Sequence, residues 1–185
     1  MVHMFKYIRG NKYLSLILSS DKSGILKWYI DEPYSVHPNK KGHIGGGITM
    51  GRGKPISASR KQNINTRSST ESEIIVVDQF IPSVLWTSIV LEAWGCGVTD
   101  NIFSQDNKSA ILMENNVKSS SSKRTKQINI IYFYIIDRIL RGKILVEWCS
   151  TGEMTRDLLT KPNQGSIFRR FRDLGMGFVP KNRPK

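Results

Sequence analysis

Alternating apolar and polar positions give the first clear structural signal along the chain. Residues Ile25–Asp31 (ILKWYID) are rich in aromatic and β-branched residues, and their alternation predicts a strand. The glycine-rich run at 45–50 and residues 55–59 continue the pattern on either side of a turn at 51–53. The run lacks the Lys-Ser/Thr ending of a phosphate loop and no helical pattern follows it, so we interpret it as a strand with close backbone approach or a bulge. Residues 25–59 are therefore predicted to form three antiparallel strands.

Apolar positions at helical spacing predict three longer helices farther along the chain. The first is expected from Glu73 to about Trp94, with Pro82 kinking or splitting it. A strongly apolar helix is expected over 125–141 and a basic amphipathic helix over 164–174. The positions that carry these patterns are Ile74, Val77, Ile81, Val84 and Leu85 in the first helix and Ile167, Phe168, Phe171 and Leu174 in the last.

Shorter patterns fill most of the remaining chain. Residues 21–24 (DKSG) have the composition of a turn. The other predicted elements are helices over 2–9, 107–115 and 153–160, a weak strand over 13–19, and strands over 101–106 and 144–149. Antiparallel strands come first and are followed by alternating helices and strands. This order predicts an α/β fold with a mixed sheet of five strands, in which the later strands run parallel to the first.

Composition adds an expected partner. The chain of 185 residues has a net charge of +13 and a pI of about 9.9. A charge this positive favours nucleic acid as partner, ahead of an anionic membrane surface. Cys96 and Cys149 lie outside any metal-ligand pattern and are expected to be buried free thiols rather than a disulfide. The apolar segment 128–140 is too short to span a bilayer, so we expect an intracellular protein without a membrane partner.

Four acids occupy positions that a fold of this kind can bring together. Asp31 ends the first strong strand, Asp106 ends the fourth, Glu73 lies near the start of the long helix, and Asp157 opens a late helix. Each has an ordinary structural alternative: Asp31 as a turn former, or the acid before Ile74 as the closing residue of a capping box. Four carboxylates packed together need a countercharge, which Mg²⁺ supplies through oxygen ligands. We therefore expect a carboxylate cage for divalent metal.

Six segments in order resemble one known family. They are LKWYID, GGGITMGRG, TRSSTESEI, IFSQDNKSAI, SSKRTKQINI and TGEMTRDLLTKP, and together they resemble the ribonuclease H domain of copia-type retrotransposon polyproteins from about Phe5 to Phe171. The opening MFKYIRGNKYLSLILS resembles the connector that follows the reverse transcriptase in those polyproteins. The resemblance implies a ribonuclease H-like sheet with helices on both faces. It divides the chain into a connector remnant (1–24) of a longer protein, a ribonuclease H-like domain (25–162), and a basic C-terminal helix and tail (163–185).

The resemblance also implies an activity and a site. The activity is metal-dependent hydrolysis of the RNA strand of RNA–DNA hybrids, with Asp31, Glu73, Asp106 and Asp157 as catalytic, metal-binding acids. They would hold two Mg²⁺ ions, which Mn²⁺ can replace; one ion would activate water and the other would stabilise the leaving oxygen. Glu71 is about 200° around the helix from Glu73 and cannot face the same metal.

The same resemblance implies nucleic-acid contacts. Ser69, Thr70 and Asn107 flank the acids and are expected to recognise the RNA 2′-hydroxyl by hydrogen bonding. The basic residues Lys123, Arg124 and Lys126 are expected to hold phosphates of the DNA strand, with a solvated face as the alternative. The reverse transcriptase part of the same polyprotein is the expected protein partner, in a cytoplasmic virus-like particle or in the nucleus. Glu153, one turn before Asp157, would assist the cage.

The sequence departs from the family at three positions. Glu32 and Pro33 follow the first acid where the family has small residues, Gln127 stands where the family has His, and His37 has no assigned role. The alternative to a nuclease is a catalytically decayed nucleic-acid-binding remnant of the same fold. An integrase-like strand-transferring nuclease is a further alternative, but the fourth acid and the Ser-Thr run before Glu73 argue against it. A membrane-surface protein would rest on charge alone.

Overall fold

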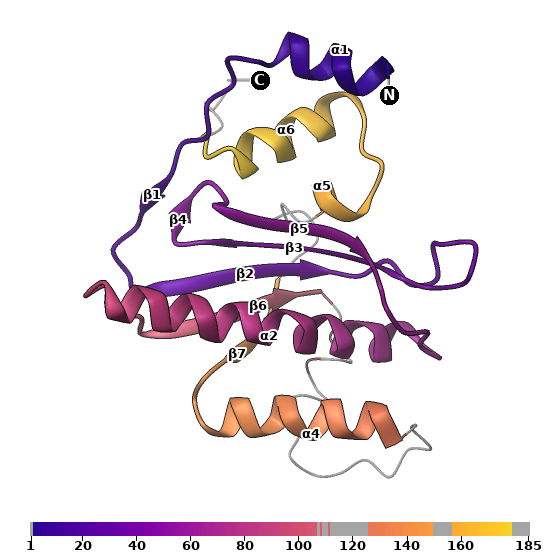
Figure 1. Cartoon of the computed structure of the whole chain (residues 1–185), viewed down its shortest axis with the longest axis vertical. Coiled ribbons are helices and arrows are strands. Elements are labelled where there is room, and N and C mark those ends of the chain that lie inside the picture. Colours follow the sequence, from indigo (N-terminus) through magenta and orange to yellow (C-terminus); the bar gives the residue numbers. More distant parts are fainter. Residues whose placement is uncertain (1, 107, 109–110, 112–125, 150–156, 179–185) are drawn as a thin grey trace.

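The computed structural model describes residues 2–106, 108, 111, 126–149 and 157–178 of the chain. Its helices and strands follow the predicted order closely (Figure 1). In chain order the elements are α1 (Val2–Gly10), β1 (Ser19–Ser20), β2 (Ile25–Asp31), β3 (His43–Thr49), β4 (Gly51–Arg52), β5 (Ile56–Lys61), α2 (Ser69–Ala93), β6 (Asp100–Gln105), α4 (Lys126–Leu140), β7 (Leu145–Trp148), α5 (Asp157–Thr160) and α6 (Gly165–Gly175).

Five of these strands form one mixed sheet with the order β5-β3-β2-β6-β7. Strand β3 pairs antiparallel with both β2 and β5, whereas β6 pairs parallel with both β2 and β7. The predicted α/β fold, with three antiparallel strands followed by parallel ones, is therefore confirmed. A small separate sheet pairs β1 with β4.

The core lies between the sheet and α2. Alternate residues of β2 point toward it, so that Leu26, Trp28 and Ile30 are completely buried. The Trp28 ring lies 6.3 Å from the ring of Phe80 on α2 and 6.2 Å from that of Phe103 on β6. Burying an aromatic or aliphatic side chain of this size stabilises the fold by roughly 1.5–3 kcal/mol. Helix α4 packs against α2 beyond the sheet (Figure 1).

Two neighbouring glycines of β3 allow helices to approach both faces of the sheet. A Cβ on Gly46 would lie 2.6 Å from Cζ of Phe80, on the face covered by α2. A Cβ on Gly45 would lie 2.2 Å from Cγ2 of Thr160, on the opposite face, where α5 packs. Successive side chains of a strand point to opposite faces, so each glycine makes room for a different layer. The predicted close backbone approach in this run is confirmed, and helices cover both faces.

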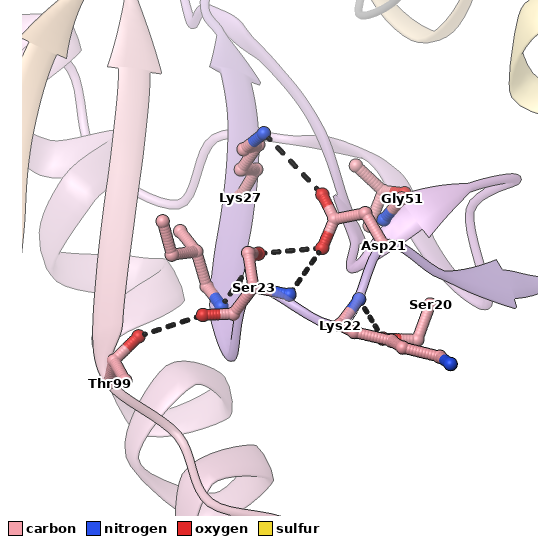
Figure 2. A network of polar contacts seen from close by, with 9 residues as sticks. Ser20, Asp21, Lys22, Ser23, Lys27, Gly51 and Thr99 are labelled. Atoms are coloured by element: carbon pink, nitrogen blue, oxygen red, sulfur yellow. Dashed lines mark hydrogen bonds and ion pairs between the residues drawn. The ribbon is translucent and has the colours of Figure 1, made fainter.

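A polar turn fixes the start of β2 against the start of β6 (Figure 2). Asp21 accepts hydrogen bonds from the backbone N–H and the hydroxyl of Ser23, and these bonds lower the pKa of the Asp21 carboxyl. Thr99, just before β6, donates its hydroxyl proton to the Ser23 carbonyl and its backbone N–H to the Gly24 carbonyl. The turn predicted at 21–24 is therefore confirmed, and it holds the two parallel strands at a common starting level.

The predicted strand over 13–19 is wrong for most of its length. Only Ser19 and Ser20 pair with another strand, and the partner is β4 rather than the main sheet. The N–H of Ile17 instead bonds to the Met176 carbonyl, just after α6. Leu16 and Leu18 remain largely exposed, so alternation here does not reflect a buried sheet face.

Helix α2 continues through Pro82, so of the two predicted outcomes, a kink or a split, the split is wrong. Apolar residues on both sides of Pro82, such as Phe80, Ile81 and Val84, pack into the same core. By length and composition α2 is apolar enough to cross a membrane, and 44% of its most apolar stretch is buried inside the domain. Its buried apolar residues pack in the core, whereas Trp86, in the second half of the helix, is exposed.

Three smaller expectations need correction or lie outside the described residues. Both cysteines are free, but Cys96 is exposed because it follows the end of α2, and Cys149 is half-buried, so neither is a fully buried thiol. In α6 only Phe171 is buried, and Ile167 is 56% exposed. Lys108 and Ile111 are helical, but the other residues of the helix predicted over 107–115, and the first part of the one predicted over 153–160, are not described by the structure.

Candidate metal centre

Three acids from three separate elements meet at one edge of the sheet. Asp31 ends β2, Asp106 follows the last residue of β6, and Glu73 lies in the second turn of α2. One carboxylate oxygen from each lies within 4.8 Å of the others. Asp31 and Glu73 are each 5% exposed, and Asp106 is half-buried. This acidic cluster (Asp31, Glu73 and Asp106) is the arrangement that the sequence predicted for three of its four acids.

The strand register explains why Asp31 and Asp106 are neighbours. In the parallel pair of β2 and β6, Ile25 lies opposite Asp100 and Tyr29 lies opposite Ser104. The same offset, continued to the ends of both strands, brings Asp31 level with Asp106. Because parallel strands end at the same edge of a sheet, acids at their carboxyl ends share that edge.

The start of α2 separates the roles of its first two acids. Ser68 is the N-cap, and its hydroxyl oxygen accepts the N–H of Glu71. The carboxylate of Glu71 accepts the N–H of Arg67 and closes the cap. This closure belongs to Glu71, so the alternative that gave it to Glu73 is wrong. Glu73 points to the buried side because two residues turn a helix by about 200°.

Another buried acid, Glu32, follows Asp31 directly in the chain and lies next to the cluster. It is 3% exposed, and a Cβ on Gly42 would lie only 1.2 Å from its Oε1, so Gly42 leaves the space that Glu32 fills. Burial raises the pKa of Glu32 to about 7, and the Asp31 carboxylate adds to the rise. The Ser72 hydroxyl, which forms a hydrogen bond with the Thr66 hydroxyl, offsets part of this rise in pKa. Sequence reasoning noted Glu32 only as a departure from the family.

Thr160 reaches the acidic cluster from α5. Its hydroxyl donates a hydrogen bond to Oδ2 of Asp31 at 2.5 Å. Sequence reasoning missed this residue, although it lies in the matching segment TGEMTRDLLTKP; the hydrogen bond joins residues 129 positions apart and depends on the fold. Asp157 is the first residue of α5, three positions before Thr160, and its side chain lies outside the described part of the structure.

The predicted nucleic-acid residues are only partly described. Ser69 is exposed and Thr70 is half-buried in the first turn of α2, just before the buried Ser72 and Glu73. Lys126 and Gln127 begin α4, but their side chains are not described. Asn107, Lys123, Arg124 and Glu153 lie outside the described residues.

His37, which had no assigned role, is part of a hydrogen-bonded line. Its Nε2 lies 3.1 Å from Nδ1 of His43, and Nε2 of His43 lies 2.9 Å from the Ser59 hydroxyl. Burial and the neighbouring Lys61 and His43 lower the pKa of His37. The line continues through Ser59 on β5 to the Leu159 carbonyl on α5.

The acidic cluster has the donor set of a hard divalent cation. Its three possible ligands are all carboxylate oxygens, the type that Mg²⁺ and Mn²⁺ prefer over nitrogen or sulfur. Two of the acids are almost completely buried, where like charges repel strongly. A divalent cation held by these oxygens offsets that repulsion, so the residues present fit such an ion.

Comparison with known proteins places this geometry in context. No protein-family model matches the chain. Over 159 residues the chain is 28% identical to the retrovirus-related Pol polyprotein from transposon TNT 1-94 of Nicotiana tabacum. That match covers 85% of the chain and 12% of the polyprotein, so the chain spans a small part of the relative's length.

A solved structure shows the same fold. The chain is similar to LC11-RNase H1, isolated from compost by a metagenomic approach, with a TM-score of 0.53 and 12% sequence identity. The match covers 72% of this chain and 89% of that protein. The structural match shows a ribonuclease H fold, and the sequence match shows that the chain resembles a segment of a retrotransposon Pol polyprotein.

Proposed function

We propose that this chain hydrolyses the RNA strand of RNA–DNA hybrids in a reaction that depends on divalent metal, as part of a retrotransposon Pol polyprotein. The observation that carries the proposal is the meeting of Asp31, Glu73 and Asp106 within 4.8 Å at one edge of a ribonuclease H-like sheet. A structural role for all three acids is a poor explanation, because burying like charges together without a cation opposes folding.

In this proposal Asp31, Glu73 and Asp106 hold divalent metal, and Asp157 from α5 completes the set. When bound, two Mg²⁺ ions, or Mn²⁺ in their place, would activate the attacking water and stabilise the leaving oxygen. The chain's own contribution is to fix the carboxylates before substrate arrives. Two parallel strands and a capped helix do this, and rigid elements hold such groups more accurately than loops do.

Substrate choice would depend on groups around the cluster. Ser69 and Thr70 lie in the first turn of α2, close in sequence to Glu73, and with Asn107 we propose that they recognise the 2′-hydroxyl that only the RNA strand carries. Lys123, Arg124 and Lys126 would hold phosphates of the DNA strand, helped by a net charge of +13. The reverse transcriptase part of the polyprotein would supply the hybrid, in a cytoplasmic particle or the nucleus.

The test is cleavage of an RNA–DNA hybrid labelled on each strand, with Mg²⁺ or Mn²⁺ and with EDTA. Asp106→Asn should abolish cleavage, whereas Asp100→Asn should not. Asp100 makes a matched control because it is an exposed acid at the other end of the same strand. Double-stranded RNA serves as the substrate control.

Cleavage of the RNA strand alone, lost in Asp106→Asn and in EDTA, is the expected result. Hybrid binding without cleavage by the wild-type chain would overturn the nuclease and leave the decayed binding remnant. Cleavage of duplex DNA would instead favour the integrase-like alternative.

A further inference from the structure

The end of α5 is attached to the sheet at two points. Thr160 donates its hydroxyl proton to Oδ2 of Asp31 at 2.5 Å, and Ser59 on β5 donates to the carbonyl of Leu159 at 2.7 Å. Gly45 on β3 lies beneath both residues, because a Cβ there would meet Cγ2 of Thr160 and Cβ of Leu159. The last turn of α5 is therefore held against β2, β3 and β5 at the level of the first acid.

The proton directions in this anchor follow from its acceptors. A carbonyl only accepts, so Ser59 commits its single hydroxyl proton to Leu159. Nε2 of His43, 2.9 Å from the same hydroxyl oxygen, must then be the donor. In the neutral ring its Nδ1 is left as an acceptor, and Nε2 of His37 at 3.1 Å donates to it.

These directions decide between two interpretations of the His37–His43–Ser59 line. A serine nucleophile needs a histidine that accepts the serine proton. Here His43 donates to Ser59, and the serine proton points to a backbone carbonyl. The line therefore functions as an anchor for α5 rather than as a hydrolytic triad.

The bond from Thr160 restricts the orientation of the Asp31 carboxylate. An aspartate carboxylate turns easily about its terminal torsion, and binding a metal requires one orientation. With Oδ2 held by Thr160, the carboxylate keeps a fixed orientation toward Glu73 and Asp106. Partners that orient metal ligands in this way commonly change metal affinity by about 10- to 100-fold when removed.

We propose that Thr160 is a positioning residue that orients Asp31 for divalent metal, and that Ser59 and the two histidines secure α5 so that Thr160 can do so. This inference rests on the proposed function of the acidic cluster. It assigns no contact with substrate to Thr160.

The experiment measures Mn²⁺ and Mg²⁺ binding by titration calorimetry on the whole chain, beside hybrid cleavage. Thr160→Val keeps the side-chain shape without the hydroxyl and should weaken Mn²⁺ binding about 10- to 100-fold. Thr160→Ser keeps the hydroxyl and should restore near wild-type affinity. Ser59→Ala should weaken binding by a smaller factor. Thr87→Val and Ser57→Ala are the matched controls; the Thr87 hydroxyl donates to the Ser83 carbonyl within α2, and Ser57 lies two residues before Ser59 on β5.

Unchanged Mn²⁺ affinity in folded Thr160→Val, with wild type active, would overturn the inference and leave the nuclease intact. If circular dichroism shows that Thr160→Val does not fold, Ser59→Ala decides: affinity equal to that of Ser57→Ala overturns the anchor. A wild-type chain that binds neither metal nor cleaves hybrid rejects the proposed function, and the inference with it.

Discussion

Glu71 and Glu73 stand two residues apart at the start of α2, and their carboxylates lie on different sides of the helix. Glu71 accepts the N–H of Arg67 at the helix end, whereas Glu73 is 5% exposed and lies in the acidic cluster. Neighbouring acids in one segment therefore have separate tasks, one in capping and one at the candidate metal centre.

Exchanging each acid for its amide should separate these tasks. Glu71→Gln keeps an oxygen that can accept the Arg67 N–H, so stability should change by less than about 0.5 kcal/mol and metal binding should persist. Glu73→Gln removes one charge from the cluster and should abolish measurable Mn²⁺ binding. Calorimetric titration and thermal unfolding check both variants. Equal losses of metal affinity in the two variants would contradict this division.

Divalent metal bound by the acidic cluster should raise the free energy of unfolding of the chain. In EDTA, Asp106→Asn should be more stable than wild type, because it removes one of three close carboxylate charges. On adding Mg²⁺ at about 100 times its dissociation constant, wild type should gain about 2.7 kcal/mol and Asp106→Asn much less. Chemical unfolding with and without Mg²⁺ measures this, with Asp100→Asn as control. A wild-type stability that is indifferent to Mg²⁺ would reject the metal centre.

The effect of Gly45→Ala on metal affinity should depend on the side chain at position 160. Gly45→Ala adds a methyl group only 2.2 Å from Cγ2 of Thr160, which is too close for either group to stay in place. The variant should therefore displace α5 and weaken metal binding. Adding Thr160→Ser removes that Cγ2 and keeps the hydroxyl, so the double variant should recover affinity. The measurement is a double-mutant cycle on Mn²⁺ affinity.

Gly46→Ala is the control for this cycle. Its new methyl group would meet the Phe80 ring at 2.6 Å, on the other face of the sheet. It should cost about 1–3 kcal/mol of stability through overpacking, with no rescue by Thr160→Ser. Rescue of both glycine variants by the same serine would argue against a specific contact.

Glu32 should make stability depend on pH. Its pKa in the folded chain is raised to about 7 from 4.5, so the folded state holds the proton more tightly than the unfolded state. The stability that protonated Glu32 contributes is therefore fully present below about pH 4.5, and this contribution is lost as the pH rises to about 7. At 1.36 kcal/mol per pH unit, the loss is about 3 kcal/mol at most.

The variant Glu32→Gln should remove this dependence. Its urea unfolding free energy, measured without divalent metal, should exceed that of wild type at pH 8 and approach it at pH 5. Glu92→Gln, at an exposed position near the end of α2, should follow the wild-type curve. A Glu32→Gln curve parallel to that of wild type at every pH would show that Glu32 is not the titrating group.

Local sequence signals by themselves determined most of the elements and the identity of the candidate acids. The alternation in ILKWYID, the cap before α2 and the glycines after the helices act within a few residues, so a sequence pattern expresses them. The strand predicted over 13–19 was wrong, because the apolar residues that alternate there do not form a buried face.

Only the tertiary structure decided what surrounds the acids. The bonds of Thr160 to Asp31 and of Ser59 to Leu159 join residues 129 and 100 positions apart, and the space for Glu32 exists because Gly42 has no side chain. Such contacts depend on how the layers pack. Packing is a property of surfaces that meet after folding, whereas hydrophobic periodicity is already present in each segment of the chain.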